Sequence, residues 1–255
     1  MRSIFINCNK AKTLLSIFII LSISLGLSAQ SKIEEAENQD TITNLTFSDN
    51  FYIEMEGGTQ ILFSSDVENL EKRDRLTPSF AISAGKWFTP VFGANIKVRG
   101  YSLNGFSTTE GTYTAASGSG GMFEDDPVRQ EVTINPDGTY RHFIRYADIS
   151  LNLYISMINL LTGYKKETFF DIIPSAGIGN MHVFAYKGIP ENNCLSGNAG
   201  LTGKFHLGPK LDVNINANSV FFDNSFEGRI AGSDKYEYYA SASIGIVYYI
   251  KSRGF

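Results

Sequence analysis

Two pairs of charged residues stand at alternate positions in stretches that are otherwise uncharged. Glu54 and Glu56 fall in one stretch, and Lys97 and Arg99 fall in another. Because side chains two residues apart point to the same face of a β-strand, each pair lines one face. Two acids opposite two bases in a narrow space predict an ion-pair network, which stabilises a structure rather than transforming a substrate. The alternative is four solvated charges on a surface.

The three histidines and Cys194 give little support for catalysis. His142, His182 and His206 show no zinc-binding spacing, and the sequence has no G-x-S-x-G nucleophile elbow. His206 falls on the polar face of its strand, where a serine could pair with it as a nucleophile, or where it is simply a hydrogen-bond partner. Cys194 is most simply a residue near the start of a strand. We expect no catalytic residue, no metal, no cofactor and no enzymatic activity.

Residues 104–139 form the second candidate site. Residues 124–126 (Glu-Asp-Asp) and 135–138 (Asn-Pro-Asp-Gly) carry the oxygen atoms that calcium prefers, but neither completes a calcium-loop pattern. The alternative is a solvated acidic loop that contains an Asp-Gly turn. Since the segment is long, rich in glycine and serine, and without hydrophobic periodicity, we expect a loop that could bind an extracellular partner.

Hydrophobic alternation of period two predicts the strands that position these residues. The clearest runs are 51–63, 92–102, 211–221 and 240–250, and looser runs are 77–88, 140–157, 169–186 and 195–207. Each reaches the length of about 9–11 residues that a strand needs to cross a membrane. Short connections near 89–90, 159–167 and 208–210 alternate with the longer ones at 64–75, 104–139, 187–193 and 223–235. Short turns on one side and long loops on the other are typical of an outer-membrane barrel.

Alternation by itself does not say which face of each strand points inward. In a soluble sandwich or a lipocalin-type barrel the apolar faces fill the interior, whereas in a membrane barrel they face lipid. The long strands, the aromatic residues at strand ends and the complementary charges favour the membrane arrangement. That arrangement places Lys97, Arg99 and Tyr101 inside, and Lys86 on the lipid face at its periplasmic boundary, where its amine can reach water.

Residues 1–29 have the order of a secretory signal, with a basic start, an apolar run over 14–27 and a small residue before the expected cleavage after Ala29. The apolar run is shorter than the ~20 residues that span a bilayer as a helix. Residues 30–50 are polar and are expected to form a flexible leader before a barrel domain at 51–255. The net charge of −4 argues against nucleic acid as a partner.

Several segments resemble the OmpA-like outer-membrane barrel family. They are residues 74–78, 85–90, 159–164, 173–179 and 243–249. The resemblance implies an all-β, eight-stranded, antiparallel, up-and-down transmembrane β-barrel in the cell outer membrane, without the C-terminal peptidoglycan-binding domain that many relatives carry. Both termini would lie in the periplasm, and the wall would contact membrane lipid and lipopolysaccharide. Many such barrels end in an aromatic residue used for insertion, and here residues 251–254 separate Phe255 from the last strand.

The expected function is structural: a monomeric, membrane-anchored barrel that presents its loops outside the cell. Glu54, Glu56, Lys97 and Arg99 would stabilise and occlude the interior. The alternatives are an adhesin or ligand-binding barrel that acts through loop 104–139, a narrow pore, a lipid-directed enzyme that uses His206, and a soluble lipocalin-like carrier.

Overall fold

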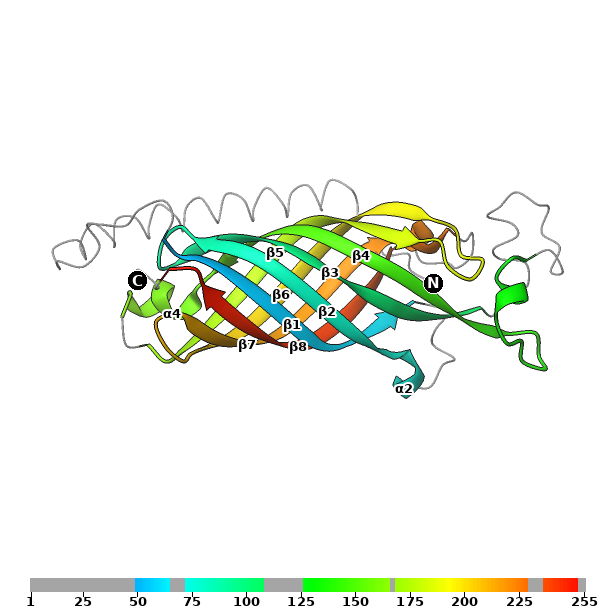
Figure 1. Ribbon diagram of the computed structural model, residues 1–255, viewed down its shortest axis with the longest axis horizontal. Coiled ribbons are helices and arrows are strands. Elements are labelled where there is room, and N and C mark those ends of the chain that lie inside the picture. Colours follow the sequence, from blue (N-terminus) through cyan, green and yellow to red (C-terminus); the bar gives the residue numbers. More distant parts are fainter. Residues whose placement is uncertain (1–48, 65–71, 108–125, 166–167, 229–235, 252–255) are drawn as a thin grey trace, which may run out of the picture.

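The protein closes into a single antiparallel β-barrel. The computed structural model describes residues 49–64, 72–107, 126–165, 168–228 and 236–251 (Figure 1). The strands are β1 (Phe51–Phe63), β2 (Leu76–Trp87), β3 (Phe92–Ser107), β4 (Tyr140–Ile155), β5 (Phe170–Phe184), β6 (Asn192–His206), β7 (Leu211–Asp223) and β8 (Tyr236–Tyr249). Each strand pairs with the next along the chain, and β8 pairs with β1. The prediction of an eight-stranded up-and-down barrel is confirmed.

Pairing of the first strand with the last leaves the sheet without an edge. The β1–β8 register runs from Tyr52 opposite Tyr249 to Phe63 opposite Tyr238. On its other side β1 pairs with β2 from Phe51 to Ile61. Closure satisfies the backbone hydrogen bonds of both terminal strands, which a hydrocarbon environment requires.

The short helices lie in the connections between strands. They are α2 (Lys72–Arg75), η3 (Arg129–Glu131), α4 (Met157–Thr162) and η4 (Asn224–Glu227). Ser156 caps α4, because its Oγ accepts a hydrogen bond from the backbone N–H of Asn159 at 3.1 Å. This cap ends β4 at Ile155, two residues before the predicted end of the strand. Among the described residues no helix is long and apolar enough to cross a membrane.

The predicted boundary of loop 104–139 is wrong at its first residue. Strand β3 continues to Ser107, which pairs with Tyr140 of β4. Leu103 and Gly105 are buried while Asn104 and Phe106 are half-buried, so the alternation continues through the first three residues assigned to the loop. The connection therefore begins at residue 108. Residues 108–125 lie outside the described part of the chain, as do the predicted signal at 1–29, most of the leader and Phe255.

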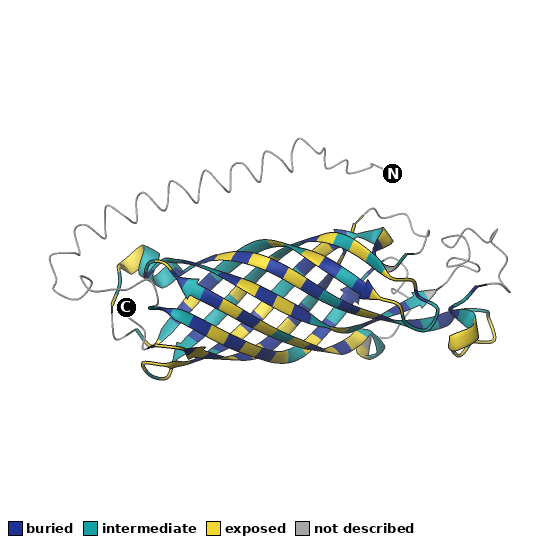
Figure 2. Cartoon of the chain, turned by 45° about the horizontal axis from the view of Figure 1, so that its top comes forward, coloured by how far each residue is buried: buried dark blue, intermediate teal, exposed yellow. Residues whose placement is uncertain are grey.

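Apolar side chains face outward and polar side chains face inward in most of the barrel. Figure 2 shows the regular alternation of exposed and buried residues along the strands. Met55, Ile96 and Ile244 are 67%, 58% and 62% exposed, whereas their polar neighbours along the strands are buried. The predicted orientation of the faces is confirmed, and it is the reverse of the arrangement in a soluble β-barrel.

Tyr101 is an exception to the predicted faces. The sequence places it inside with Lys97 and Arg99, but its side chain is 56% exposed, and its ring packs edge-on against Phe80 at 5.8 Å. Its backbone has φ 151°, which turns the residue out of the normal pleat. Tyr146, its partner in β4, is buried in the interior at this level. The outward turn therefore keeps the Tyr101 ring out of the part of the interior that the Tyr146 ring occupies.

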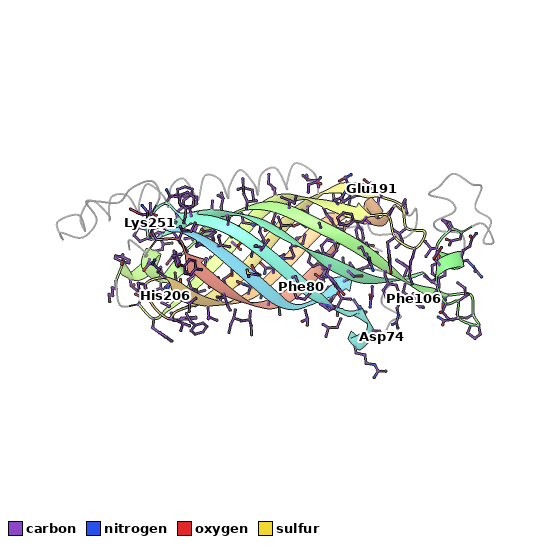
Figure 3. The ribbon with its side chains drawn as sticks, viewed as in Figure 1. Asp74, Phe80, Phe106, Glu191, His206 and Lys251 are labelled. Atoms are coloured by element: carbon purple, nitrogen blue, oxygen red, sulfur yellow. The ribbon has the colours of Figure 1, made fainter. Side chains whose placement is uncertain are left out.

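The two ends of the barrel differ in their connections. The turn end carries the connections 88–91, 156–169 and 207–210, and the loop end carries 64–75, 108–139, 185–191 and 224–235. Figure 3 shows His206 and Lys251 at the turn end, and Asp74, Phe106 and Glu191 at the loop end. Lys86 lies at the turn end with its Nζ 4.7 Å from the centroid of the Phe51 ring, which agrees with the boundary position expected for it.

Candidate functional site

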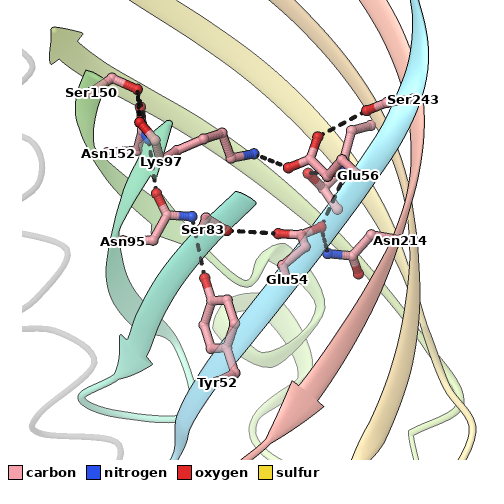
Figure 4. Close-up of polar contacts among 12 residues, drawn as sticks. Tyr52, Glu54, Glu56, Ser83, Asn95, Lys97, Ser150, Asn152, Asn214 and Ser243 are labelled. Atoms are coloured by element: carbon pink, nitrogen blue, oxygen red, sulfur yellow. Dashed lines mark hydrogen bonds and ion pairs between the residues drawn. The ribbon is translucent and has the colours of Figure 1, made fainter. Parts of the chain in front are cut away.

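The interior of the barrel brings the four predicted site residues together. Glu54 and Glu56 project inward from β1, and Lys97 and Arg99 project inward from β3, with β2 between them. All four side chains are buried. Lys97 Nζ forms an ion pair with Glu56 Oε1, and Glu56 Oε2 accepts a hydrogen bond from Ser243 Oγ at 2.9 Å (Figure 4). One acid and one base of the predicted set are therefore in direct contact.

Arg99 is opposite one acid in the β-sheet register and interacts with a second acid, which belongs to the predicted set. Its guanidinium interacts electrostatically with Glu56 and with Asp148, which is its register partner on β4. Asp148 Oδ1 accepts a hydrogen bond from Ser196 Oγ at 2.5 Å. The sequence reasoning did not single out Asp148, although it alternates with Ser150 and Asn152 on one face of its strand. Applying the same alternation to β4 would have identified it.

Glu54 is held by amides rather than by a base. Its Oε1 accepts hydrogen bonds from Asn214 Nδ2 at 2.6 Å and from Asn216 Nδ2 at 3.2 Å. Its Oε2 lies 3.4 Å from Ser83 Oγ, which donates to it. A buried carboxylate needs such donors, because desolvation without them is costly. The structure thus brings Glu54 into the network without pairing it with Lys97 or Arg99.

A glycine on β8 makes room for these acids. Gly245 is the register partner of Glu56, and a Cβ atom at Gly245 would lie 2.6 Å from Glu54 Oε1. Asn152 continues the network on the far side, where its Nδ2 donates to Asn95 Oδ1 at 2.8 Å. The middle of the interior is therefore a continuous set of charges, amides and hydroxyls.

The turn end of the interior holds a lysine among aromatic rings. Lys204 Nζ lies 4.8 Å from the centroid of the Trp87 ring and 5.6 Å from that of Tyr52. It also lies 4.0 Å from Asp212 Oδ2, while Asp212 Oδ1 is 2.9 Å from His206 Nδ1. The hydrogen-bond partner of His206 is therefore the Asp212 carboxylate. The cation–π contacts and the carboxylate together compensate the burial of Lys204.

The loop end of the interior is mostly apolar, which the sequence reasoning did not anticipate. Strand residues fill it together with three residues of the connections, Val128, Ile189 and Phe226. The strand members are Leu62, Leu103, Tyr140, Ile144, Tyr146, Met181, Val183, Val220, Phe222 and Tyr239. We call this group the loop-end core. The sequence of β1 contains evidence for this core, because its inward positions change from Glu54 and Glu56 to Leu62 toward the loop end.

The acids of the long loop have structural partners where they are described. Asp126 is buried, accepts a hydrogen bond from Tyr140 Oη at 2.5 Å and accepts another from the backbone N–H of Val128 at 3.0 Å. Asp137 Oδ1 accepts from the backbone N–H of Thr139 at 3.1 Å, within a turn that has Gly138 at φ 83°. Within the described ranges no group of three or more His, Cys, Asp or Glu residues could hold a metal ion. Cys194 packs against the loop-end core.

Comparisons with known proteins find distant relatives. The chain is 24% identical over 213 residues to outer membrane protein 41 of Porphyromonas gingivalis (strain ATCC BAA-308 / W83), covering 81% of this chain and 48% of that protein. It is 26% identical over 255 residues to outer membrane protein 40 of the same strain, covering 92% of this chain and 57% of that protein. The chain spans about half the length of these curated relatives. No family model matches the sequence.

Among solved structures, the crystal structure of Neisserial surface protein A aligns with a TM-score of 0.48 at 9% sequence identity. The alignment covers 78% of this chain and 96% of that one. Both sequence relatives are named outer membrane proteins, and the wall of the present barrel is apolar on its outside. An apolar outer wall of this extent is stable only against hydrocarbon. The protein is therefore an eight-stranded transmembrane β-barrel of the cell outer membrane.

Proposed function

We propose that the chain is a non-enzymatic, monomeric structural barrel of the OmpA-like type, whose interior is closed to solutes and whose loop end faces the outside of the cell. Export would depend on the signal at residues 1–29, and both termini would lie in the periplasm. The observation that carries the proposal is the loop-end core, which fills the interior beyond the charged network. The charged network itself lines a cavity, whose walls include Glu54, Lys97 and Arg99. The apolar core is unlike the water-filled lumen of a porin.

The loop-end core is the stronger barrier of the two. Leu62, Phe222 and Tyr239 are only 1%, 2% and 0% exposed, and they come from three different strands. Tyr239 lies 5.4 Å from Tyr146 and 6.1 Å from Phe222, measured between ring centroids. An ion would have to leave water to pass such a layer, since apolar constrictions block conduction by excluding water. This favours a closed scaffold over a narrow pore.

Planar-bilayer recording tests the proposal. The mature protein should insert without steady single-channel conductance, while a general porin in the same bilayers conducts. Migration of heated and unheated samples on a gel confirms that the inserted protein is a closed barrel. A reproducible conductance step from the heat-modifiable protein would contradict the closed interior.

A second candidate function, binding through the loops, is favoured by the way in which the loops are anchored. Val128, Ile189 and Phe226 come from three connections and are buried in the loop-end core. Anchoring of this kind presents the exposed parts of loops on a rigid base, which reduces the entropy lost on binding. Deletion of 108–125 should then abolish adhesion to host cells or glycans and leave heat-modifiable migration intact. Deletion of 229–235 provides the matched control.

A further inference from the structure

Two cations interrupt the apolar outer wall at the loop end. On β4 the outward residues Leu153, Leu151 and Ile149 are exposed and apolar, and the next charged outward residue is Arg145. Arg145 is opposite Phe184 in the β4–β5 register, and Phe184 is itself exposed on the wall. Arg145 therefore marks the level at which the hydrocarbon band ends and lipid headgroups begin.

Arg145 and Lys187 share one aromatic ring. The guanidinium Cζ of Arg145 lies 3.7 Å from the centroid of the Tyr186 ring, and Lys187 Nζ lies 5.8 Å from the same centroid. Lys187 Nζ also lies 5.7 Å from the ring of Phe143. Within the described ranges neither cation has a carboxylate at ion-pair distance. The nearby acid Glu191 lies 3.9 Å from His182. Two positive charges thus lie within 5.8 Å of one ring centroid, and within the described ranges neither is neutralised by an ion pair.

The turn that carries Lys187 is rigid. Tyr186 and Ile189 exchange two backbone hydrogen bonds of 3.1 Å, and Lys187 and Gly188 both have positive φ, at 49° and 79°. This is the backbone of a tight two-residue hairpin turn, in which a lysine is unfavourable. A Cβ atom at Gly188 would lie 2.6 Å from Val128 N, so the turn is packed against the long loop. A strained non-glycine residue on a fixed turn is a feature of functional sites.

We propose that Arg145, Lys187 and Tyr186 form a binding site for a phosphate group of an outer-leaflet glycolipid. A guanidinium can donate two parallel hydrogen bonds to a phosphate, and the ammonium adds a second charge. Phe184 lies opposite Arg145 in the register and is exposed on the wall, where acyl chains would pack. Lipid is favoured over a soluble anion because the site borders the hydrocarbon band. The inference rests on the proposed function in one respect, which is that the loop end lies at the outer leaflet of the membrane.

Native mass spectrometry of the mature barrel in detergent tests the site. The probe is a phosphorylated diglucosamine lipid, compared with the same lipid after enzymatic removal of its phosphates. Wild type should bind the phosphorylated lipid about tenfold more tightly, as expected for charge-assisted hydrogen bonds to one phosphate. Arg145→Gln combined with Lys187→Gln should lose this preference. Arg145→Lys keeps the charge but not the paired donors, so its preference should be intermediate.

Lys86→Gln is the matched control, because Lys86 also lies over an aromatic ring on the wall, at the opposite end. It should retain the full preference for phosphate. If Lys86→Gln and the double variant lose the preference for the phosphorylated lipid equally, the effect is general electrostatic attraction and the site is wrong. If the wild type binds both lipids equally, the site is also wrong. Heat-modifiable migration verifies that each variant is a closed barrel. The result is independent of conductance, so a failure of the closed-interior proposal would be recognised separately.

Discussion

The middle and the loop end of the barrel interior are stabilised by different interactions. The middle contains acids, bases and amides, such as Glu56 with Lys97, whereas the loop end contains the apolar loop-end core. Strand β4 runs through both regions. In the middle its inward residues include Asp148 and Asn152, and towards the loop end they include Tyr146 and Ile144.

The outer face of β4 becomes more polar toward the loop end, whereas its inner face becomes more apolar. It presents Ile149 and Leu151 beside the polar middle, and Arg141 and Arg145 beside the loop-end core. The strand keeps its alternation, while cations join its outer face and Tyr140, Ile144 and Tyr146 line its inner face. A barrel surrounded by lipid can keep polar groups inside, whereas a barrel surrounded by water needs an apolar core. The comparison teaches that the strands extend beyond the hydrocarbon band and end in a region built like a soluble protein.

The largest expected effect comes from removing the bases of the polar middle. Lys97→Ala combined with Arg99→Ala leaves Glu56 and Asp148 buried without their cations. We expect the free energy of unfolding to fall by about 3–5 kcal/mol, the usual cost of an uncompensated buried charge. Urea titration in lipid vesicles, followed by heat-modifiable migration, measures the change. Removing both partners of the contact pair, with Lys97→Met and Glu56→Leu, should cost much less. Wild-type stability in the first variant would remove the network hypothesis.

A slightly smaller effect is expected from a cavity in the loop-end core. Phe222 is buried against Phe226, with ring centroids 4.3 Å apart, so Phe222→Ala should lower the free energy of unfolding by about 3–4 kcal/mol. The neighbouring Phe221 points outward, and Phe221→Ala should cost about 1 kcal/mol or less. The same urea titration compares the two variants. Similar losses in both would show that the loop end is not packed as a core.

The smallest expected effect comes from a methyl group added to the polar middle. Gly245→Ala places a Cβ atom 2.6 Å from Glu54 Oε1, and the displaced carboxylate should cost about 1–3 kcal/mol. Gly57→Ala on the outer wall is the control, because its Cβ would meet only Phe80 Cε1, at 4.0 Å. That change should stay within about 0.5 kcal/mol. If Gly245→Ala is as stable as Gly57→Ala, the acids have more room than the structure indicates.

Much of the fold could be read from the sequence, because alternation and turn residues are local signals. The first strand was placed correctly at both ends, and the closed eight-stranded arrangement followed from strand number and loop length. The misjudged regions are those where the environment changes along a strand. The end of β3 at Ser107 and the outward ring of Tyr101 belong to this class. Each of these features depends on the neighbouring strand β4, which pairs with β3 as far as Ser107 and places Tyr146 opposite Tyr101.

The sequence by itself determined that Glu54 and Glu56 share one face of their strand and that Lys97 and Arg99 share one face of theirs. The reason is that side-chain direction in a strand follows from the backbone of that strand alone. Only the tertiary structure decided that Lys97 contacts Glu56, that Asn214 and Asn216 hold Glu54, and that Asp148 faces Arg99. Those partners lie on other strands, and their heights are set by the register and tilt of the closed barrel, which no single strand encodes.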